Sequence, residues 1–280
     1  MAPPNHYTIN HGPADLSRLP TYFLTFRGSE NPVPSGIPGI RALASVRGGG
    51  IGGMVNRGPV RAAVNSTFNA QLPPPAVVQD VAQAIRDSGF FLGAPGVLAG
   101  EGAASVDTDQ DLWAMVKSKV VVELLPHQGH PNYSEDDRAR YAALADTAFG
   151  LVPRGDGRWN YRFSELVGAC VIPVVIADGL TLPFSELVDW AGERLVIRIP
   201  EDVVLRTSTD DGETSPPEPD PLLGIFEHLK PFSKDDILKR RRRLCEINDL
   251  YFATSEKRAQ ALLMDAKAYL EKEEERRESP

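Results

Sequence analysis

Five short apolar runs, rich in β-branched and aromatic residues, alternate along this chain with segments of helical periodicity. The runs are Tyr22–Phe26, Lys119–Leu124, Ala148–Val152, Val171–Ile176 and Leu195–Ile199. Near-continuous apolar character is typical of strands that are buried on both faces, as in a parallel sheet. Because helical segments separate the runs, we predict an α/β fold with a doubly wound parallel sheet.

Helical segments are expected at Ala76–Ser88, Ser134–Asp146 and Tyr161–Ala169, and from Lys234 onward the chain is expected to be helical. The final ten residues, 271–280, form a charged tail to this C-terminal helical part. A basic run at residues 239–243 fits either a nucleic-acid patch or a solvated helix face. Acidic residues flank the run on both sides, which favours the solvated face.

Composition limits the classes of function. The 280 residues carry 30 basic against 38 acidic side chains, a net charge of -8, so we expect no nucleic-acid partner. The chain has no apolar stretch of about 18 residues and no basic-then-apolar start, so neither an anchor nor a signal segment is visible. Residues 28–60 and 207–221 concentrate glycine, proline or polar residues and are expected to be loop insertions; the first could also surround a ligand.

Metal and disulfide chemistry is not indicated. Two cysteines are too few for a disulfide framework or a Cys-rich zinc site, and Cys170 is expected to be a small buried apolar residue. His127 and His130 have no evident third ligand, so we predict no metal site.

The segment from Ala148 to Trp190 carries the chemistry, and it has the order strand, glycine-containing loop, helix, strand and loop. The first loop holds Arg154, Gly155 and Arg158, and Asn160 is a candidate N-cap for the helix that follows. Arginine forks match phosphate oxygens, and α/β sheets bind ligands beyond the carboxyl ends of their strands. The loop therefore predicts an anion site.

Arg162 and Glu165 stand three residues apart, on one face of the expected helix. They could form a surface ion pair worth less than about 1 kcal/mol. Alternatively, Arg162 extends the anion site, and the Glu165 carboxylate accepts hydrogen bonds from two ribose hydroxyls.

Five blocks in order resemble the exostosin-like glycosyltransferase family. They are Leu151–Gly155, Arg162–Leu166, Ile172–Val175, Leu182–Glu186 and Val188–Trp190. Tyr141–Leu144, leading into Phe149, also fits the family. Tyr22–Arg27 is similar to the strand that opens the family's nucleotide-binding domain, and either Arg41 or Arg61 would match a helical arginine after it.

The resemblance implies a GT-B fold, with two Rossmann-like domains and the active cleft between them. Residues 21–270 would be the C-terminal, nucleotide-sugar-binding domain, after an N-terminal extension at residues 1–20. Such enzymes transfer a sugar, usually from a UDP-sugar, to a glycan acceptor, and they invert the configuration at the anomeric carbon. They are typically Golgi membrane proteins. No cofactor is implied beyond the UDP-sugar donor substrate.

By position in the motifs, Arg154 and Arg162 would contact the diphosphate, Glu165 the ribose, and Gly155 would let the backbone approach the donor. Glu186 and Asp189 would line the donor pocket or cap a helix over Phe184–Trp190, and Trp190 itself is expected in the core.

Some features depart from the family pattern. Trp159-Asn160 replaces Gly-Ser, and Cys170-Val171 stands where the family has Gly-Cys. The family's N-terminal half has no counterpart in this chain, so we expect a separate N-terminal domain or a partner subunit and assign no catalytic base. The alternative function is a catalytically silent module that retains only nucleotide binding or the fold.

Overall fold

A computed structural model of the chain describes residues 15–29, 64, 67–68, 72–90, 108–125, 135–154, 161–205 and 220–278. Most of the two expected loop insertions lies outside these residues, as do Arg41, Arg61, His127 and His130.

Five parallel strands form one sheet in the order β2-β1-β3-β4-β5. They are β1 (Tyr22–Ser29), β2 (Val120–Leu125), β3 (Thr147–Pro153), β4 (Ile172–Ile176) and β5 (Ile197–Arg198). Every residue of β3 and β4 is buried, as expected for central strands of a parallel sheet. The α/β class and the five predicted strands are confirmed, although β5 is reduced to two residues.

The helices are α4 (Pro75–Asp87), α5 (Asp109–Lys119), α6 (Glu135–Leu144), α7 (Arg162–Gly168), α8 (Asp202–Leu205), α9 (Pro221–Leu229), α10 (Lys234–Ile247) and α11 (Ser255–Glu278). A π-helical turn, η1 (Asn248–Phe252), joins α10 to α11. The helices expected near Ala76, Ser134, Tyr161 and Lys234 are confirmed. The helix expected over Phe184–Trp190 is wrong, because this segment folds as turns.

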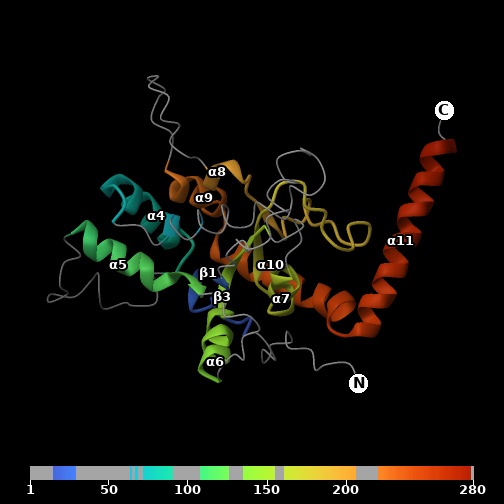
Figure 1. Cartoon of the computed structure of the whole chain (residues 1–280), viewed down its shortest axis with the longest axis horizontal. Coiled ribbons are helices and arrows are strands. Elements are labelled where there is room, and N and C mark those ends of the chain that lie inside the picture. Colours follow the sequence, from blue (N-terminus) through green and yellow to red (C-terminus); the bar gives the residue numbers. More distant parts are fainter. Residues whose placement is uncertain are drawn as a thin grey trace, which may run out of the picture.

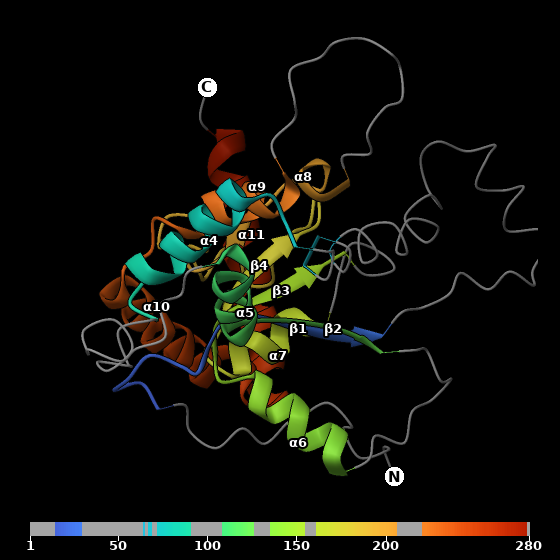
Figure 2. The same ribbon diagram turned by 90° about the vertical axis from the view of Figure 1, so that its left-hand side faces the viewer.

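The sheet lies between helices, with α4 and α9 on one side and α6 and α7 on the other (Figure 2). Phe23 of β1 stacks on Phe226 of α9, with ring centroids 5.7 Å apart. On the α7 side, a Cβ at Gly150 of β3 would lie 2.6 Å from Cδ1 of Leu166. Glycine at this position therefore permits the close approach of α7 to β3.

A disulfide between Cys170 and Cys245 joins the turn before β4 to α10, with the two Cα atoms 4.9 Å apart. The expectation that Cys170 is only a small apolar residue is therefore wrong. The prediction of a solvated basic face is also wrong for Arg241, which is 1% exposed and whose Nε donates to the carbonyl of Cys170. Position on α10 relative to β4, rather than residue type, decides the burial of Arg241.

Trp190 is a core residue, as predicted: it is buried and its ring contacts Phe163 and Phe252.

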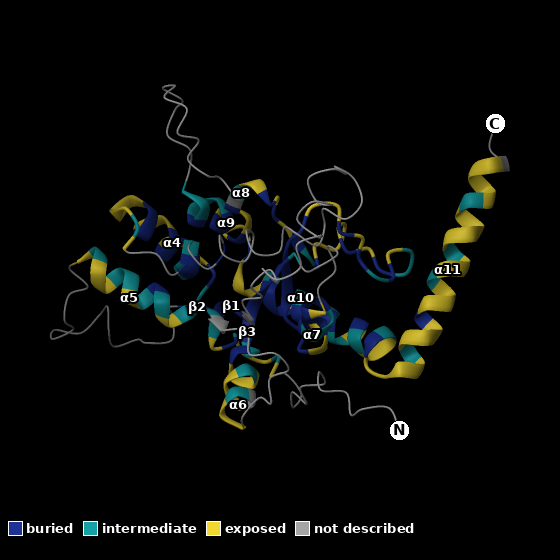
Figure 3. Cartoon of the chain, in the orientation of Figure 1, coloured by how far each residue is buried: buried dark blue, intermediate teal, exposed yellow. Residues whose placement is uncertain are grey.

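Helix α11 projects from the body of the molecule and is largely exposed (Figures 1 and 3). Its exposed apolar side chains are Leu262, Leu263, Met264, Tyr269 and Leu270, with exposed fractions between 51% and 74%. Among the helices that the structure describes, none has the length and apolar character needed to cross a bilayer.

Candidate functional site

The sheet reverses its winding direction between β1 and β3. The chain passes from β1 outward to β2 and then returns to the other side of β1 as β3. Open α/β sheets bind ligands beyond the carboxyl ends of the strands near such a reversal. Arg154 lies at this edge, because it directly follows β3 and its backbone N–H donates to Ile176 at 2.9 Å.

The Arg154 side chain is held by a carboxylate that the motifs did not indicate. Its Nη1 lies 3.3 and 3.4 Å from the two carboxylate oxygens of Glu201, which is 8% exposed. Glu201 in turn accepts a 2.9 Å hydrogen bond from the backbone N–H of Asp178, just after β4. Among the described residues, the buried Nε of Arg154 has no hydrogen-bond partner.

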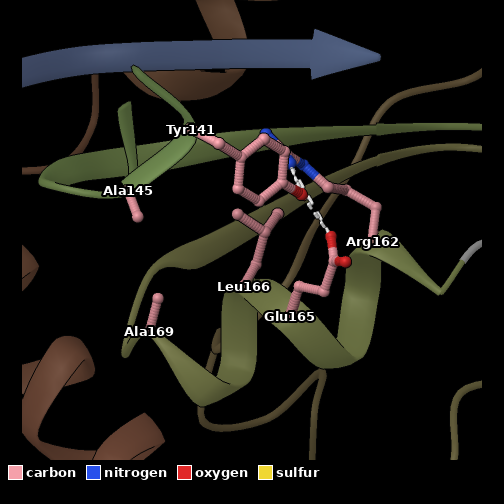
Figure 4. Close-up of a pocket in the computed structure, with 6 residues that line it drawn as sticks. All are labelled: Tyr141, Ala145, Arg162, Glu165, Leu166 and Ala169. Atoms are coloured by element: carbon pink, nitrogen blue, oxygen red, sulfur yellow. Dashed lines mark hydrogen bonds and ion pairs between the residues drawn. The ribbon is translucent and has the colours of Figure 1, made fainter. Parts of the chain in front are cut away.

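A second charged cluster lies between α6 and α7 (Figure 4). Arg162 donates through Nη1 to the hydroxyl of Tyr141, and this hydroxyl donates to Glu165. Arg162 and Glu165 approach to 3.7 Å, and the guanidinium carbon of Arg162 lies 4.6 Å from the centroid of the Tyr141 ring. The predicted pairing is therefore present, but it is not a surface ion pair, because both side chains are largely buried.

Burial raises the pKa of Glu165 from its usual 4.5 to about 7, and the nearby Arg162 guanidinium opposes this rise. The loss of contact with water disfavours the charged carboxylate more than Arg162 stabilises it. Glu165 therefore changes its charge near neutral pH, which is unusual for a carboxyl group beside an arginine.

This pKa predicts a pH dependence of stability. Between about pH 4.5 and 7 the folded state holds a proton on Glu165 that the unfolded chain has lost, so stability should fall as pH rises, by about 3 kcal/mol. Above about pH 7, Glu165 is ionised in both the folded and the unfolded state, so its contribution to stability should no longer change with pH. Urea unfolding of the wild type and Glu165→Gln at pH 5, 6, 7 and 8 measures it, since the variant removes the titrating group.

The matched control is Glu227→Gln, at an exposed site on α9. We expect its stability to follow that of the wild type in parallel at all four pH values. A constant difference between the wild type and Glu165→Gln over the whole range would contradict the raised pKa.

The pocket beside this cluster is small. It is lined by Tyr141, Ala145, Arg162, Glu165, Leu166 and Ala169, and its volume is about 10 Å³. This is near the lower limit for a single water molecule. A nucleotide does not fit between these side chains as they stand.

The other predicted site residues have different surroundings. Gly155, Arg158 and Asn160 lie outside the described residues, and Tyr161, which precedes α7, makes no side-chain cap. Glu186 is tied to α11: its N–H donates to Asp265 at 2.9 Å, and its carboxylate pairs with Lys272 at 3.1 Å. Asp189 accepts from the N–H of Gly192, which caps a turn.

The structure thus brings Arg162 and Glu165 together, whereas Arg154 and Glu186 each have separate partners. Two further residues, Tyr141 and Glu201, were missed as site residues. Tyr141 stood in a block that fits the family but was given no role, and no sequence signal pointed to Glu201. Within the described parts of the chain, no group of three or more His, Cys, Asp or Glu residues is arranged to hold a metal ion.

Residues 100–209 match the family model described as the Exostosin GT47 domain. Curated relatives include Exostosin-1a of Danio rerio, 40% identical over 77 residues, and the Exostosin-1 homolog of Caenorhabditis elegans, 44% identical over 64 residues. These matches cover 25% and 22% of this chain, but only 10% and 17% of the relatives. Exostosin-1 of Mus musculus is 38% identical over 66 residues, which is 21% of this chain and 9% of the relative.

The chain therefore spans a small part of the curated relatives that it matches. The matched region nevertheless holds Arg154, Arg162, Glu165 and Glu201, together with strands β2 to β5. Residues 100–209 are therefore similar to the Exostosin GT47 domain, and the five motif blocks predict this similarity.

Proposed function

We propose that this chain is the donor-binding part of an inverting glycosyltransferase that transfers a sugar from a UDP-sugar to a glycan acceptor. The observation that carries the proposal is the arrangement around β3: within the GT47 match, Arg154 follows the strand and Arg162 begins the next helix. The parallel sheet with helices on both sides also supports its assignment as the Rossmann-like, C-terminal domain of a GT-B enzyme.

In the proposed reaction an acceptor hydroxyl attacks the anomeric carbon, and the bond from that carbon to the diphosphate oxygen breaks. The diphosphate leaves with the bonding electron pair, so negative charge develops on its oxygens. Arg154 and Arg162 would stabilise this charge, Arg158 would add a further positive charge, and Gly155 would let the backbone approach the donor. Glu165 would accept hydrogen bonds from the ribose, and Tyr141 would orient both Arg162 and Glu165.

The proton of the acceptor hydroxyl requires a base, which we place on a second domain or a partner subunit. The exposed apolar side chains of α11 support this, because exposed apolar surface commonly marks a contact with another protein surface. Glu186, tied to α11, would then lie near that contact rather than in the donor pocket.

We propose a Golgi location for the protein. The Cys170–Cys245 disulfide supports it, because disulfides persist in oxidising compartments of the secretory route and are rare in the cytosol. The family resemblance implies the same location.

One observation favours the alternative of a catalytically silent module. Arg162 and Glu165 are buried against each other, and their pocket is smaller than any nucleotide group. If this arrangement persists with UDP present, the chain retains the fold of the family without its donor contacts.

Isothermal titration with UDP tests the proposed function. We expect binding by the wild type, and we expect Arg162→Ala to weaken it by about 1.5–3 kcal/mol, the range for a hydrogen bond to a charged group. Arg162→Lys keeps the positive charge but loses the forked guanidinium, so its affinity for UDP should lie between those of the wild type and Arg162→Ala.

Arg277→Ala, at an exposed position near the end of α11, is the matched control and should bind UDP as the wild type does. Thermal melts establish that each variant is folded. If the folded wild type binds no UDP at millimolar concentration, the donor-binding proposal is wrong. Equal affinity of the wild type and Arg162→Ala would restrict Arg162 to a structural role.

A further inference from the structure

Helix α6 makes its apolar contact with the core at one end. Its last residue, Leu144, is 1% exposed, and the carbonyl of Leu144 accepts a 2.8 Å hydrogen bond from the buried hydroxyl of Thr25 in β1. The other residues of α6 whose exposure the structure describes are exposed or half-buried. Apolar burial is the main favourable contribution when an element packs onto a protein. The core therefore holds α6 firmly at its C-terminal end only.

Closer to its N-terminus, α6 is held to the sheet by ion pairs. The carboxylate of Asp137 lies 2.6 Å from Nη2 of Arg27 in β1, and Nε of Arg140 donates to Glu123 of β2 at 2.9 Å. The side chains of Asp137 and Arg140 are 38% and 42% exposed, so water screens both pairs. Such pairs are typically weak. This end of α6 can therefore leave the sheet at a lower cost than a helix that is packed through apolar residues.

Tyr141, one turn after Asp137, connects α6 to α7. Its hydroxyl accepts from Arg162 and donates to Glu165 (Figure 4). In the proposed function, these two side chains contact the diphosphate and the ribose of the donor. The Tyr141 hydroxyl thus occupies the hydrogen-bonding groups that a donor would use, and the space beside it is only about 10 Å³. The structure therefore shows α6 closed over Arg162 and Glu165.

We propose that α6 is a lid over Arg162 and Glu165, that it turns outward about Leu144, and that the donor then replaces the Tyr141 hydroxyl. The inference rests on the proposed function, since it requires a donor that contacts these two side chains. Tyr141 keeps them oriented until the donor arrives. The lid also explains why the pocket is smaller than any nucleotide group, because the closed state does not have to hold the donor.

The lid has a consequence for affinity. Because the donor contacts Arg162 and Glu165 only when α6 is open, its apparent affinity is reduced by the fraction of molecules that are open. Weakening the ion pairs of α6 raises this fraction and hence the affinity. Loss of a residue that merely supports the donor site would instead lower the affinity. The direction of the change therefore distinguishes a lid from a supporting element.

Calorimetric titration of UDP into the wild type, Asp137→Asn and Arg140→Gln tests the lid. Asp137→Asn keeps the size of the side chain but removes the charge that faces Arg27. We expect it to bind UDP about two- to tenfold more tightly than the wild type, as the open fraction increases. Arg140→Gln, which breaks the pair with Glu123, should change the affinity in the same direction.

The matched control is Asp136→Asn, which changes an exposed carboxylate next to Asp137. Both residues lie in the first turn of α6, so the two variants lose the same favourable interaction with the helix dipole. Asp136→Asn should bind UDP as the wild type does. Thermal melts establish that each variant is folded.

Hydrogen exchange follows the lid directly. A helix of ten residues that leaves its neighbours is marginal in water, so the amides of α6 before Leu144 should exchange faster when UDP is bound to the wild type. The amides of α7, which contacts the donor, should exchange more slowly. A donor that binds without moving α6 would slow exchange in both helices.

The outcomes separate the two proposals. Unchanged or weaker UDP binding by the folded variants would overturn the lid and leave the donor-binding proposal standing, and so would slower exchange of α6 in the presence of UDP. If Asp137→Asn does not fold, Arg140→Gln decides in the same way. A wild type and variants that bind no UDP would reject the proposed function and, with it, the lid.

Discussion

Cys245→Ala should lower the free energy of unfolding by about 4 kcal/mol under oxidising conditions, and reduction of the wild type should have the same effect. The disulfide closes a loop between residues that are 75 apart in sequence. Restricting the unfolded chain over a loop of this length is worth about 4 kcal/mol in the chain-entropy model, within a usual range of about 2–5 kcal/mol for native disulfides. Urea unfolding with and without reductant measures the change.

Alanine is the informative substitution here, because Cys245 is half-buried on α10 and alanine favours the helix. The reduced wild type serves as the matched control, and it should unfold at nearly the same urea concentration as the variant. Equal stability of the oxidised wild type and Cys245→Ala would show that the disulfide contributes little, and that contacts of α10 with α7 and β4 are sufficient to hold it.

The sequence predicted the sheet well because its signal is local. The strands are buried on both faces, so apolar character runs through each without interruption, as in β3 and β4. Helix α5 was missed for the converse reason. Val116 is its only buried residue, so the helix has no apolar stripe that a pattern could reveal.

Contacts between distant segments could not be predicted. Helical spacing placed Arg162 beside Glu165, and they do pair. Their common partner, Tyr141, comes from a different helix and lies more than twenty residues earlier in the chain. The contact of Arg154 with Glu201 spans 47 residues and depends on how β5 lies against β4.

The disulfide and the buried Arg241 also depend on contacts between distant segments. Two isolated cysteines and a run of arginines have ordinary local interpretations, and only the docking of α10 against the start of β4 pairs Cys245 with Cys170. The same docking buries Arg241 over the carbonyl of Cys170. Spacing along the sequence contains no information on that contact.

The largest effect is expected for catalysis by this chain alone: it should bind the donor but transfer sugar very slowly or not at all. A positioned general base typically contributes about 10²–10⁴-fold to a rate. Holding an acceptor within about 3–3.5 Å of the reacting carbon contributes more. In the proposed function both come from a second domain, whereas Arg154 and Arg162 assist only the leaving diphosphate. Slow hydrolysis of the donor to free sugar should therefore remain.

A radiolabelled UDP-sugar assay with oligosaccharide acceptors measures both reactions, with residues 1–280 alone and with an added N-terminal domain from a related exostosin-type enzyme. The matched variants are Arg162→Ala, which should slow the residual hydrolysis, and Arg277→Ala, which should leave it unchanged. If the added domain raises transfer by at least about a hundredfold, the missing base lies there, as proposed. Efficient transfer by residues 1–280 alone would overturn the prediction, because the base would then have to be among the residues of this chain.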